Sequence, residues 1–232
     1  MATKLKWVFP ETITQHEVQE PQMVVRSCLN GLDEQGVVTK TLYCTRDGRF
    51  FVRYADGWHK QQPDTHTQRR KQATGLTTPS RGGSTDCPNM RSDFSHYTCH
   101  RLVAYAWCEH PACAKTDPEW YKHYEADHIN CDHGNWTADN LQWVTPAENR
   151  RRAKLARCMR KIGLQPKWLY HSILRGLYSL PTEQAELVIN RFRLEAGTSD
   201  DAITIGRINS TFAFLLDELK NQPSWNRPIN GA

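Results

Sequence analysis

The chain has 232 residues, of which 38% are hydrophobic and 24% are charged, and its formal net charge is +5. This composition is typical of a globular protein, and no run approaches the ~18 apolar residues that identify a membrane-spanning helix. The first residues also lack the apolar core of a secretory signal, so we expect a cytoplasmic protein without a membrane partner.

Residues 24–60 are predicted to form short strands. The segments MVVRSCL, GVVTKTLYCT and RFFVRYADGWHK are rich in β-branched and aromatic residues, and Asp47-Gly48 and Asp56-Gly57 supply turn signals between strands. The expected product is a small antiparallel sheet.

The next segment, residues 61–90, is polar and loop-like, with Arg69, Arg70 and Lys71 among Gly, Ser, Thr and Pro. Two interpretations remain open for it. It is either a linker or a basic arm that becomes ordered on a phosphate backbone.

Helical periodicity begins within residues 97–110, where Leu102, Val103, Ala106 and Trp107 form one apolar face. Three further helical patterns follow, in residues 166–180, 182–197 and 200–220, with Gly197 as a candidate helix C-cap. The fold class is therefore predicted to be α+β. We expect a β-rich region in residues 1–95, a central unit in 96–162 and a helical domain in 163–232, with a helix-turn-helix as one arrangement of the last.

The stretch YEADHINCDHGNWTADNLQWVTPAEN, residues 124–149, concentrates groups that ligate metals or move protons. It reads as two short strands joined by a polar loop. Thr145, Pro146 and Glu148 then form a capping box, which predicts a helix that begins at Pro146. Asp127 and His128 would end the first strand and face Asn149 on this helix.

These residue types suit hydrolysis of a phosphodiester. Carboxylate and amide oxygens, as in Asp127 and Asn149, are ligands that Mg²⁺ accepts while keeping positions for water and phosphate. A neighbouring imidazole such as His128 can take the proton of a water molecule.

The same residues resemble the HNH endonucleases, in particular the phage- and intron-encoded homing type. The similar segments are HRLVA at residues 100–104, the Asp127-His128 pair, NLQWVT at residues 140–145 and the final Asn149. The resemblance covers residues 100–153. The chain departs from the family pattern at Asn130-Cys131, where Asp-Gly is frequent.

The resemblance implies a ββα-metal nuclease in which His128 is the general base. Asp127 and Asn149 would hold one Mg²⁺ or Mn²⁺ per active site, and Asn140 would brace the loop and help to orient His128. Taken singly, the Asp-His pair also fits a solvated turn, and the two asparagines also fit turn and cap residues.

A basic run follows the motif directly. It contains no acidic residue, and its position beside the motif suggests a polyanion, double-stranded DNA, as the partner. A solvated basic helix face is the alternative. The predicted phosphate contacts, together with the arm of residues 69–71, are Arg150, Arg151, Arg152, Lys154 and Arg157.

A second metal site is compatible with the spacing of several soft ligands. Cys108, Cys113, Cys131 and His133, with His110 nearby, would suit a structural zinc ion. The spacing is looser than in paired Cys-x-x-Cys sites, so we expect zinc-free protein.

Two classes of function follow. The leading hypothesis is a metal-dependent DNA endonuclease that acts as a monomer and therefore nicks one strand. The competing hypothesis is a DNA-binding protein on the same scaffold that cuts nothing. A nuclease without sequence preference is a third, ranked lower because most of the chain lies outside the motif.

Overall fold

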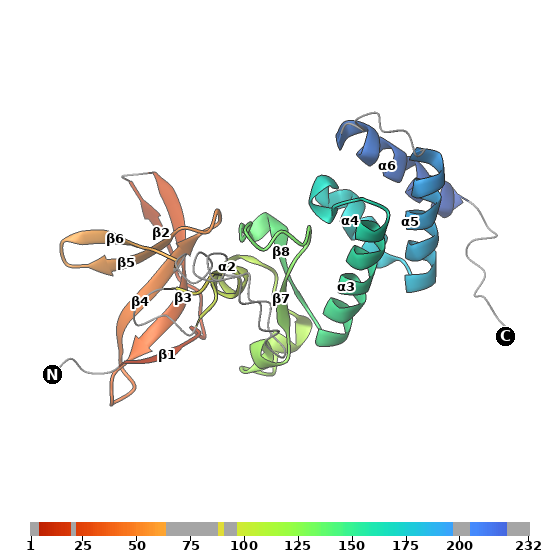
Figure 1. The fold of residues 1–232 in the computed structure, drawn as a ribbon. Coiled ribbons are helices and arrows are strands. Elements are labelled where there is room, and N and C mark those ends of the chain that lie inside the picture. The colour runs from red at the N-terminus through yellow and green to blue at the C-terminus, as the bar shows by residue number, and fades with distance from the viewer. Residues whose placement is uncertain (1–4, 20–21, 64–87, 91–96, 197–204, 222–232) are drawn as a thin grey trace, which may run out of the picture. The chain divides into compact units, whose positions relative to one another are not determined.

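The computed structural model describes residues 5–19, 22–63, 88–90, 97–196 and 205–221. It has the predicted α+β class, with an antiparallel sheet in the N-terminal part and helices in the C-terminal part (Figure 1). Two compact units divide the chain. Unit 1 comprises residues 1–128 and 133–144, and unit 2 comprises residues 129–132 and 145–232.

The sheet of unit 1 has six strands. They are β1 (Lys6–Val8), β2 (Gln15–Val18), β3 (Met23–Leu32), β4 (Val38–Thr45), β5 (Phe50–Tyr54) and β6 (Gly57–Gln61). The order is β1-β3-β4-β5-β6, and β2 also pairs with β3. The predicted antiparallel sheet and its two Asp-Gly turns are confirmed, and Gly48 and Gly57 adopt positive φ angles of 84° and 131°.

The sheet is strongly curled. The His16 ring on β2 lies 5.9 Å from the Trp58 ring on β6, although β3, β4 and β5 separate these two strands in the pairing. Tyr43 on the central β4 contacts both rings, at 5.3 and 5.0 Å. One face of the sheet therefore encloses a small apolar cluster that includes Val25 and Phe51.

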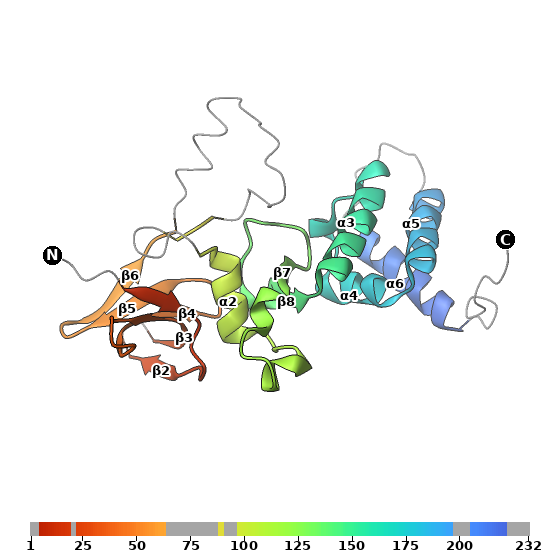
Figure 2. The same cartoon turned by 90° about the horizontal axis from the view of Figure 1, so that it is seen from below.

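The other face packs against helix α2 (Cys99–Trp107), which lies between the sheet and strands β7 and β8 in Figure 2. The α2 residues Leu102 and Val103 share one core with Leu29 and Leu42 of the sheet and with Leu141 of strand β8. The compact units therefore do not follow the expected boundary at residues 95 and 96, because one continuous core joins the sheet to the central motif.

The remainder of unit 1 consists of short elements: η2 (Ala112–Lys115), η3 (Trp120–Lys122), β7 (Glu125–His128), η4 (Ala138–Asn140) and β8 (Leu141–Val144). Strands β7 and β8 are antiparallel, with Asp127 opposite Gln142 and His128 opposite Leu141. The predicted pair of strands with a polar loop between them is confirmed.

Unit 2 is helical. It contains α3 (Pro146–Lys161), η5 (Pro166–Trp168), α4 (His171–Ser179), α5 (Thr182–Ala196) and α6 (Ile205–Asn221). The helices enclose a core in which the Phe192 and Phe212 rings stack at 4.3 Å. Leu155 and Met159 of α3 belong to this core, so α3 groups with the later helices and the compact units do not divide at residues 162 and 163.

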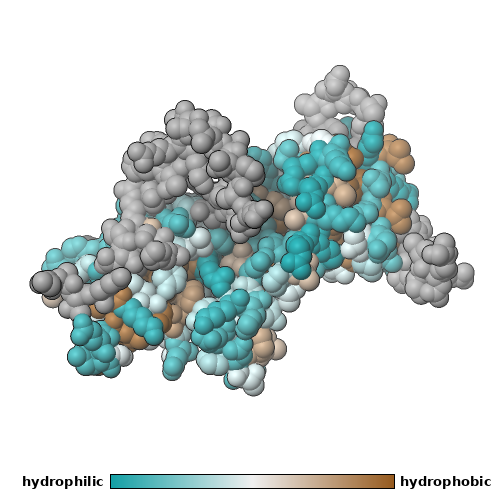
Figure 3. Space-filling model, turned by 60° about the horizontal axis from the view of Figure 1, so that its bottom comes forward, coloured by the Kyte–Doolittle hydropathy of each residue, from teal (hydrophilic) through white to brown (hydrophobic). Residues whose placement is uncertain are grey.

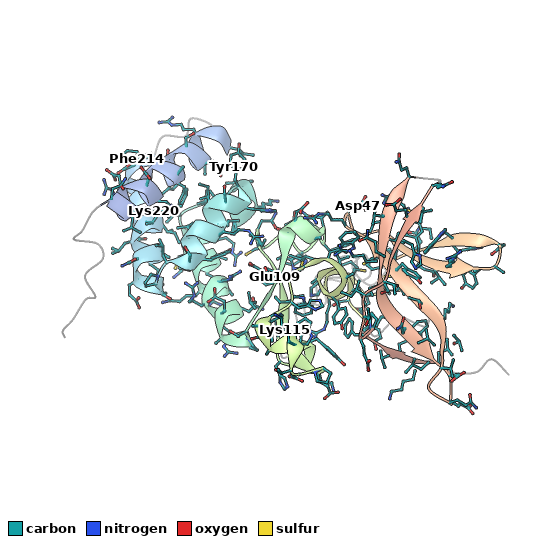
Figure 4. The ribbon with its side chains drawn as sticks, turned by 180° about the vertical axis from the view of Figure 1, so that it is seen from behind. Asp47, Glu109, Lys115, Tyr170, Phe214 and Lys220 are labelled. Atoms are coloured by element: carbon teal, nitrogen blue, oxygen red, sulfur yellow. The ribbon has the colours of Figure 1, made fainter. Side chains whose placement is uncertain are left out.

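Hydrophilic side chains cover much of the visible surface of these helices, with separate apolar patches between them (Figure 3). The exposed apolar residues include Leu187, Leu194 and Phe214. Figure 4 labels Tyr170 before α4, and Phe214 and Lys220 of α6.

The arrangement of these helices as a helix-turn-helix stays a prediction, and the C-cap candidate Gly197 lies outside the described residues. None of the described helices is long and apolar enough to cross a membrane.

Candidate active site

The candidate site begins at the carboxyl end of β7. Asp127 is half-buried, and its Oδ2 accepts a hydrogen bond from Nε2 of Gln142 at 3.3 Å on the paired strand β8. His128, the next residue, is only 4% exposed. The strand pair therefore places a carboxylate and a buried imidazole side by side in sequence at the start of the polar loop.

His128 has two imidazole neighbours in the described part of unit 1. The His133 ring stacks on it with centroids 5.0 Å apart and an interplanar angle of 6°. The His100 ring lies 5.0 Å away and is tilted by 41°. His100 is the first residue of the HRLVA segment that carries the resemblance, and no catalytic role was predicted for it from the sequence.

His100 is chemically unusual. Its Nδ1 is buried and has no hydrogen-bond partner among the described residues. Burial, followed by the neighbouring His128, Arg101 and His133, lowers the pKa of His100 from 6.5 to about 3. The ring is therefore neutral at physiological pH, with one nitrogen as donor and the other as acceptor.

Asn140 braces the loop between β7 and β8. Its side chain is fully buried, and Nδ2 donates a hydrogen bond of 2.8 Å to the carbonyl of Asn135. The Oδ1 of Asn135 in turn accepts hydrogen bonds from the backbone N and Oγ1 of Thr137, at 3.2 and 2.8 Å. The loop thus has a hydrogen-bonded frame of its own.

The turn between β4 and β5 holds the same loop from outside; Figure 4 labels its Asp47. Trp136 Nε1 donates to the carbonyl of Gly48 at 3.1 Å, and the backbone N of Ala138 donates to the carbonyl of Arg46 at 2.9 Å. Arg46 Nε also bonds Asp139 Oδ1 at 3.2 Å. A Cβ on Gly48 would lie 2.5 Å from the Trp136 ring, so this close approach requires glycine.

Asn130 and Cys131 stand where the HNH pattern that the sequence resembles frequently has Asp-Gly, and Cys131 adopts a backbone conformation that favours glycine. Cys131 has φ of 56°, in the left-handed region that residues with a Cβ rarely adopt. Asn130 Oδ1 accepts a hydrogen bond of 2.9 Å from the backbone N of Asp132, which is the pattern of an Asx turn. The turn therefore forms without the usual Asp-Gly.

The predicted N-cap and first residue of α3 are confirmed, whereas the Glu148 carboxylate accepts hydrogen bonds from Arg151 and Arg152. Thr145 is the N-cap, its side chain accepts a hydrogen bond from the backbone N of Glu148 at 3.2 Å, and Pro146 is the first helical residue. Asn149 lies in the first turn of this helix, as predicted, and its backbone N bonds the Thr145 carbonyl at 2.9 Å. Its role as a metal ligand stays a prediction.

The cations of α3 fall into two groups. Arg151 donates to Glu148 at 2.7 Å, to the carbonyl of Leu180 at 3.0 Å and to the carbonyl of Tyr178. Arg152 also pairs with Glu148 at 2.7 Å, and its guanidinium lies 4.7 Å from the centre of the Tyr178 ring. These two predicted phosphate contacts therefore have partners inside unit 2.

The remaining predicted phosphate contacts on α3 are more exposed than Arg151 and Arg152. The Lys154 side chain is 55% exposed, although it pairs with Glu186 at 2.7 Å. Arg150 and Arg157 are exposed, and no described acidic residue pairs with them. Arg69, Arg70 and Lys71 lie outside the described residues.

The thiols predicted as alternative zinc ligands have different surroundings. Cys108 Sγ lies 3.6 Å from the carbonyl of Ala138, whereas Cys113 pairs with the Tyr124 hydroxyl and raises its pKa. Cys131, in unit 2, lies 3.9 Å from the Tyr178 hydroxyl, and His133 stacks on His128. Within the described ranges, no group of three or more His, Cys, Asp or Glu side chains is placed to hold a metal ion.

Comparison with known proteins adds no further information. No family model matches the chain, and searches of curated proteins and of solved structures give no significant match.

Proposed function

We propose that the chain is a metal-dependent DNA endonuclease of the HNH type. The observation that carries the proposal is the buried His128 at the end of β7, preceded by Asp127 and followed by a loop that Asn140 braces. A polar group that is buried in a rigid frame beside other imidazoles has a fixed orientation, which is what a general base needs.

His128 would act as the general base. It would take one proton from a water molecule, whose oxygen forms a bond to phosphorus while the bond from phosphorus to the leaving sugar oxygen breaks. The leaving oxygen then takes a proton from solvent. Asn140 would act through the loop, because its bond to Asn135 holds the part of the loop that leads into β8.

The donor chemistry fits a hard divalent ion. Asp127 supplies carboxylate oxygens at the strand end, and Mg²⁺ is commonly held by one or two carboxylates with water completing its shell. When bound, Mg²⁺ or Mn²⁺ would stabilise the charge that develops on the phosphate. Asn149 stays the second ligand that the sequence predicts.

Double-stranded DNA is the proposed substrate because of the charge on α3. Arg150 and Arg157 are both exposed on α3, and the last turn of this helix carries Arg160 and Lys161. Phosphate contacts of this kind supply sequence-independent affinity that falls with salt.

The competing function is a DNA-binding protein that does not cleave. The exposed Arg150 and Arg157 on α3 would serve such a protein equally well. The two proposals agree on DNA binding and differ on hydrolysis.

The experiment that separates them is a cleavage assay. Purified protein is incubated with supercoiled plasmid and genomic DNA, with and without Mg²⁺ or Mn²⁺, and the ends are mapped. We expect wild-type protein to nick DNA only with metal, and His128→Ala to lose on the order of 10²–10⁴-fold in rate while its DNA affinity is kept.

Asp127→Asn serves as the companion variant, because it should raise the Mg²⁺ concentration needed for half-maximal cleavage. Binding without any cleavage by wild-type protein would establish the competing function. Cleavage by His128→Ala at the wild-type rate would disprove the role of His128.

A further inference from the structure

The buried Nδ1 of His100 marks a place where an additional hydrogen-bonding partner belongs. Buried polar atoms of native proteins are almost always satisfied, by protein groups or by ordered water. Nδ1 of His100 has no partner among the described residues, and its ring packs 5.0 Å from that of His128. The ring that carries this unsatisfied nitrogen therefore lies beside the proposed general base.

The protonation state of His100 limits what this partner can be. Burial first, and the neighbouring His128, Arg101 and His133 next, lower its pKa to about 3, so the ring carries no charge at neutral pH. A neutral imidazole neither neutralises a phosphate nor serves as the acid for a leaving group. It can hydrogen-bond one water molecule, the usual partner of a buried polar atom that has no protein partner.

The separation of the two rings is compatible with one shared water molecule. Hydrogen bonds between water and a ring nitrogen are about 2.7–3.2 Å long. One water can therefore bridge nitrogens on two rings whose centres lie 5.0 Å apart.

We propose that His100 is a second catalytic histidine, whose Nδ1 holds the water molecule from which His128 takes the proton. This rests on the proposed nuclease function. The bonds formed and broken are the same as in the proposed nuclease reaction: the proton passes to His128 and the water oxygen bonds to phosphorus. His100 contributes only a hydrogen bond, which fixes the position of the attacking oxygen.

Two substitutions of His100 distinguish the effect of the ring's size from the effect of its hydrogen bond. In His100→Asn the side-chain amide occupies the place of Nδ1, whereas in His100→Phe a ring of similar size carries no polar atom. We expect His100→Phe to reduce the single-turnover cleavage rate by about 10²-fold, the effect of a misplaced reactant. His100→Asn should recover most of that loss, and the DNA affinity of both variants should equal that of wild type.

The matched control is His110→Phe. His110 also lies in unit 1 and packs on an aromatic ring, that of Trp120 at 4.6 Å, but its Nε2 has a partner in the carbonyl of Tyr105 at 2.6 Å. This variant should lower the melting temperature and leave the cleavage rate of the folded protein unchanged. His100→Phe should keep its melting temperature, because it removes a polar atom that lacks a protein partner.

The outcomes are distinguishable. If wild-type protein cuts no DNA with any metal, both the nuclease function and the role of His100 are overturned. If wild-type protein cuts and His100→Phe cuts equally fast, or if His100→Asn is as slow as His100→Phe, only the role of His100 is overturned.

Discussion

Three histidine residues lie close together at the end of β7: His100 and His133 both have ring centroids 5.0 Å from that of His128. His128 is buried with other imidazoles around it, and His100 among these has an unsatisfied nitrogen. A histidine that stays neutral in the folded protein, but is protonated in the unfolded chain, also makes stability depend on pH.

The sign of this dependence follows from the lowered pKa of His100. Between pH 6.5 and about 3, the unfolded chain binds a proton at this residue and the folded chain does not. The contribution to stability is therefore fully present above pH 6.5 and is lost as pH falls. From pH 7 to pH 5 the free energy of unfolding should decrease by up to about 2 kcal/mol from this residue.

Urea unfolding of wild type and His100→Phe, followed by tryptophan fluorescence, measures this difference. Trp7, Trp58, Trp107, Trp120, Trp136 and Trp143 lie in unit 1 and Trp168 lies in unit 2, so the signal reports mainly the unit that contains His100. The two proteins should differ in their pH slope by about one proton in this range. Parallel pH profiles would contradict the assignment of a neutral buried His100.

At the scale of elements, helix α3 shows how one basic run can serve two purposes. Arg151 donates to the carbonyls of Tyr178 and Leu180 at the end of α4, which satisfies groups that a helix C-terminus leaves without partners. Glu148 pairs with Arg151 and Arg152, and these pairs lower its pKa. Arg157 is exposed on the same helix.

Substitution of the two arginines should therefore have different effects. Arg151→Ala should destabilise unit 2 by about 1–3 kcal/mol, because it leaves carbonyls and Glu148 without their partner. Arg157→Ala should change stability by less than about 0.5 kcal/mol, but it should weaken DNA binding and reduce the salt slope by about one.

Thermal melting and fluorescence anisotropy across a salt series give the two measurements. The assignment fails if Arg151→Ala flattens the salt dependence and Arg157→Ala does not. In that case Arg151, and not Arg157, would contact phosphate.

The local elements were predictable and the contacts between distant segments were not. The Asp-Gly turns, the Thr145 N-cap and the strand pair around the polar loop each depend on a few neighbouring residues, and the structure confirms them. The bond from Trp136 to Gly48 and the packing of His100 on His128 join residues far apart in sequence. No spacing rule in a single sequence encodes such contacts.

At the scale of the whole molecule, the two units are interleaved in sequence. Residues 129–132 belong to unit 2, although residues on both sides of them belong to unit 1. Ile129 is fully buried in the helical core, and its carbonyl accepts a hydrogen bond of 3.0 Å from the Tyr178 hydroxyl. The loop that begins at the candidate site thus supplies part of the core of unit 2.

Ile129→Ala tests this division. It should destabilise unit 2 by about 2–5 kcal/mol, because it leaves a cavity in a closed core. Hydrogen exchange should speed up in α4 and α5, while the amides of β3 and β4 keep their protection. Leu102→Ala, a buried substitution in unit 1, should give the reverse pattern, and uniform acceleration in both variants would show that the units unfold together.

The assignment of residues 129–132 to unit 2 also bears on how such a protein can evolve. A single recombination point after β8 would exchange the helices but leave Ile129 behind, without the core that it fills in the present chain. The helical unit and the loop that starts at His128 are therefore expected to be inherited together. New specificities would then arise by substitution on the helix surfaces more readily than by shuffling whole domains.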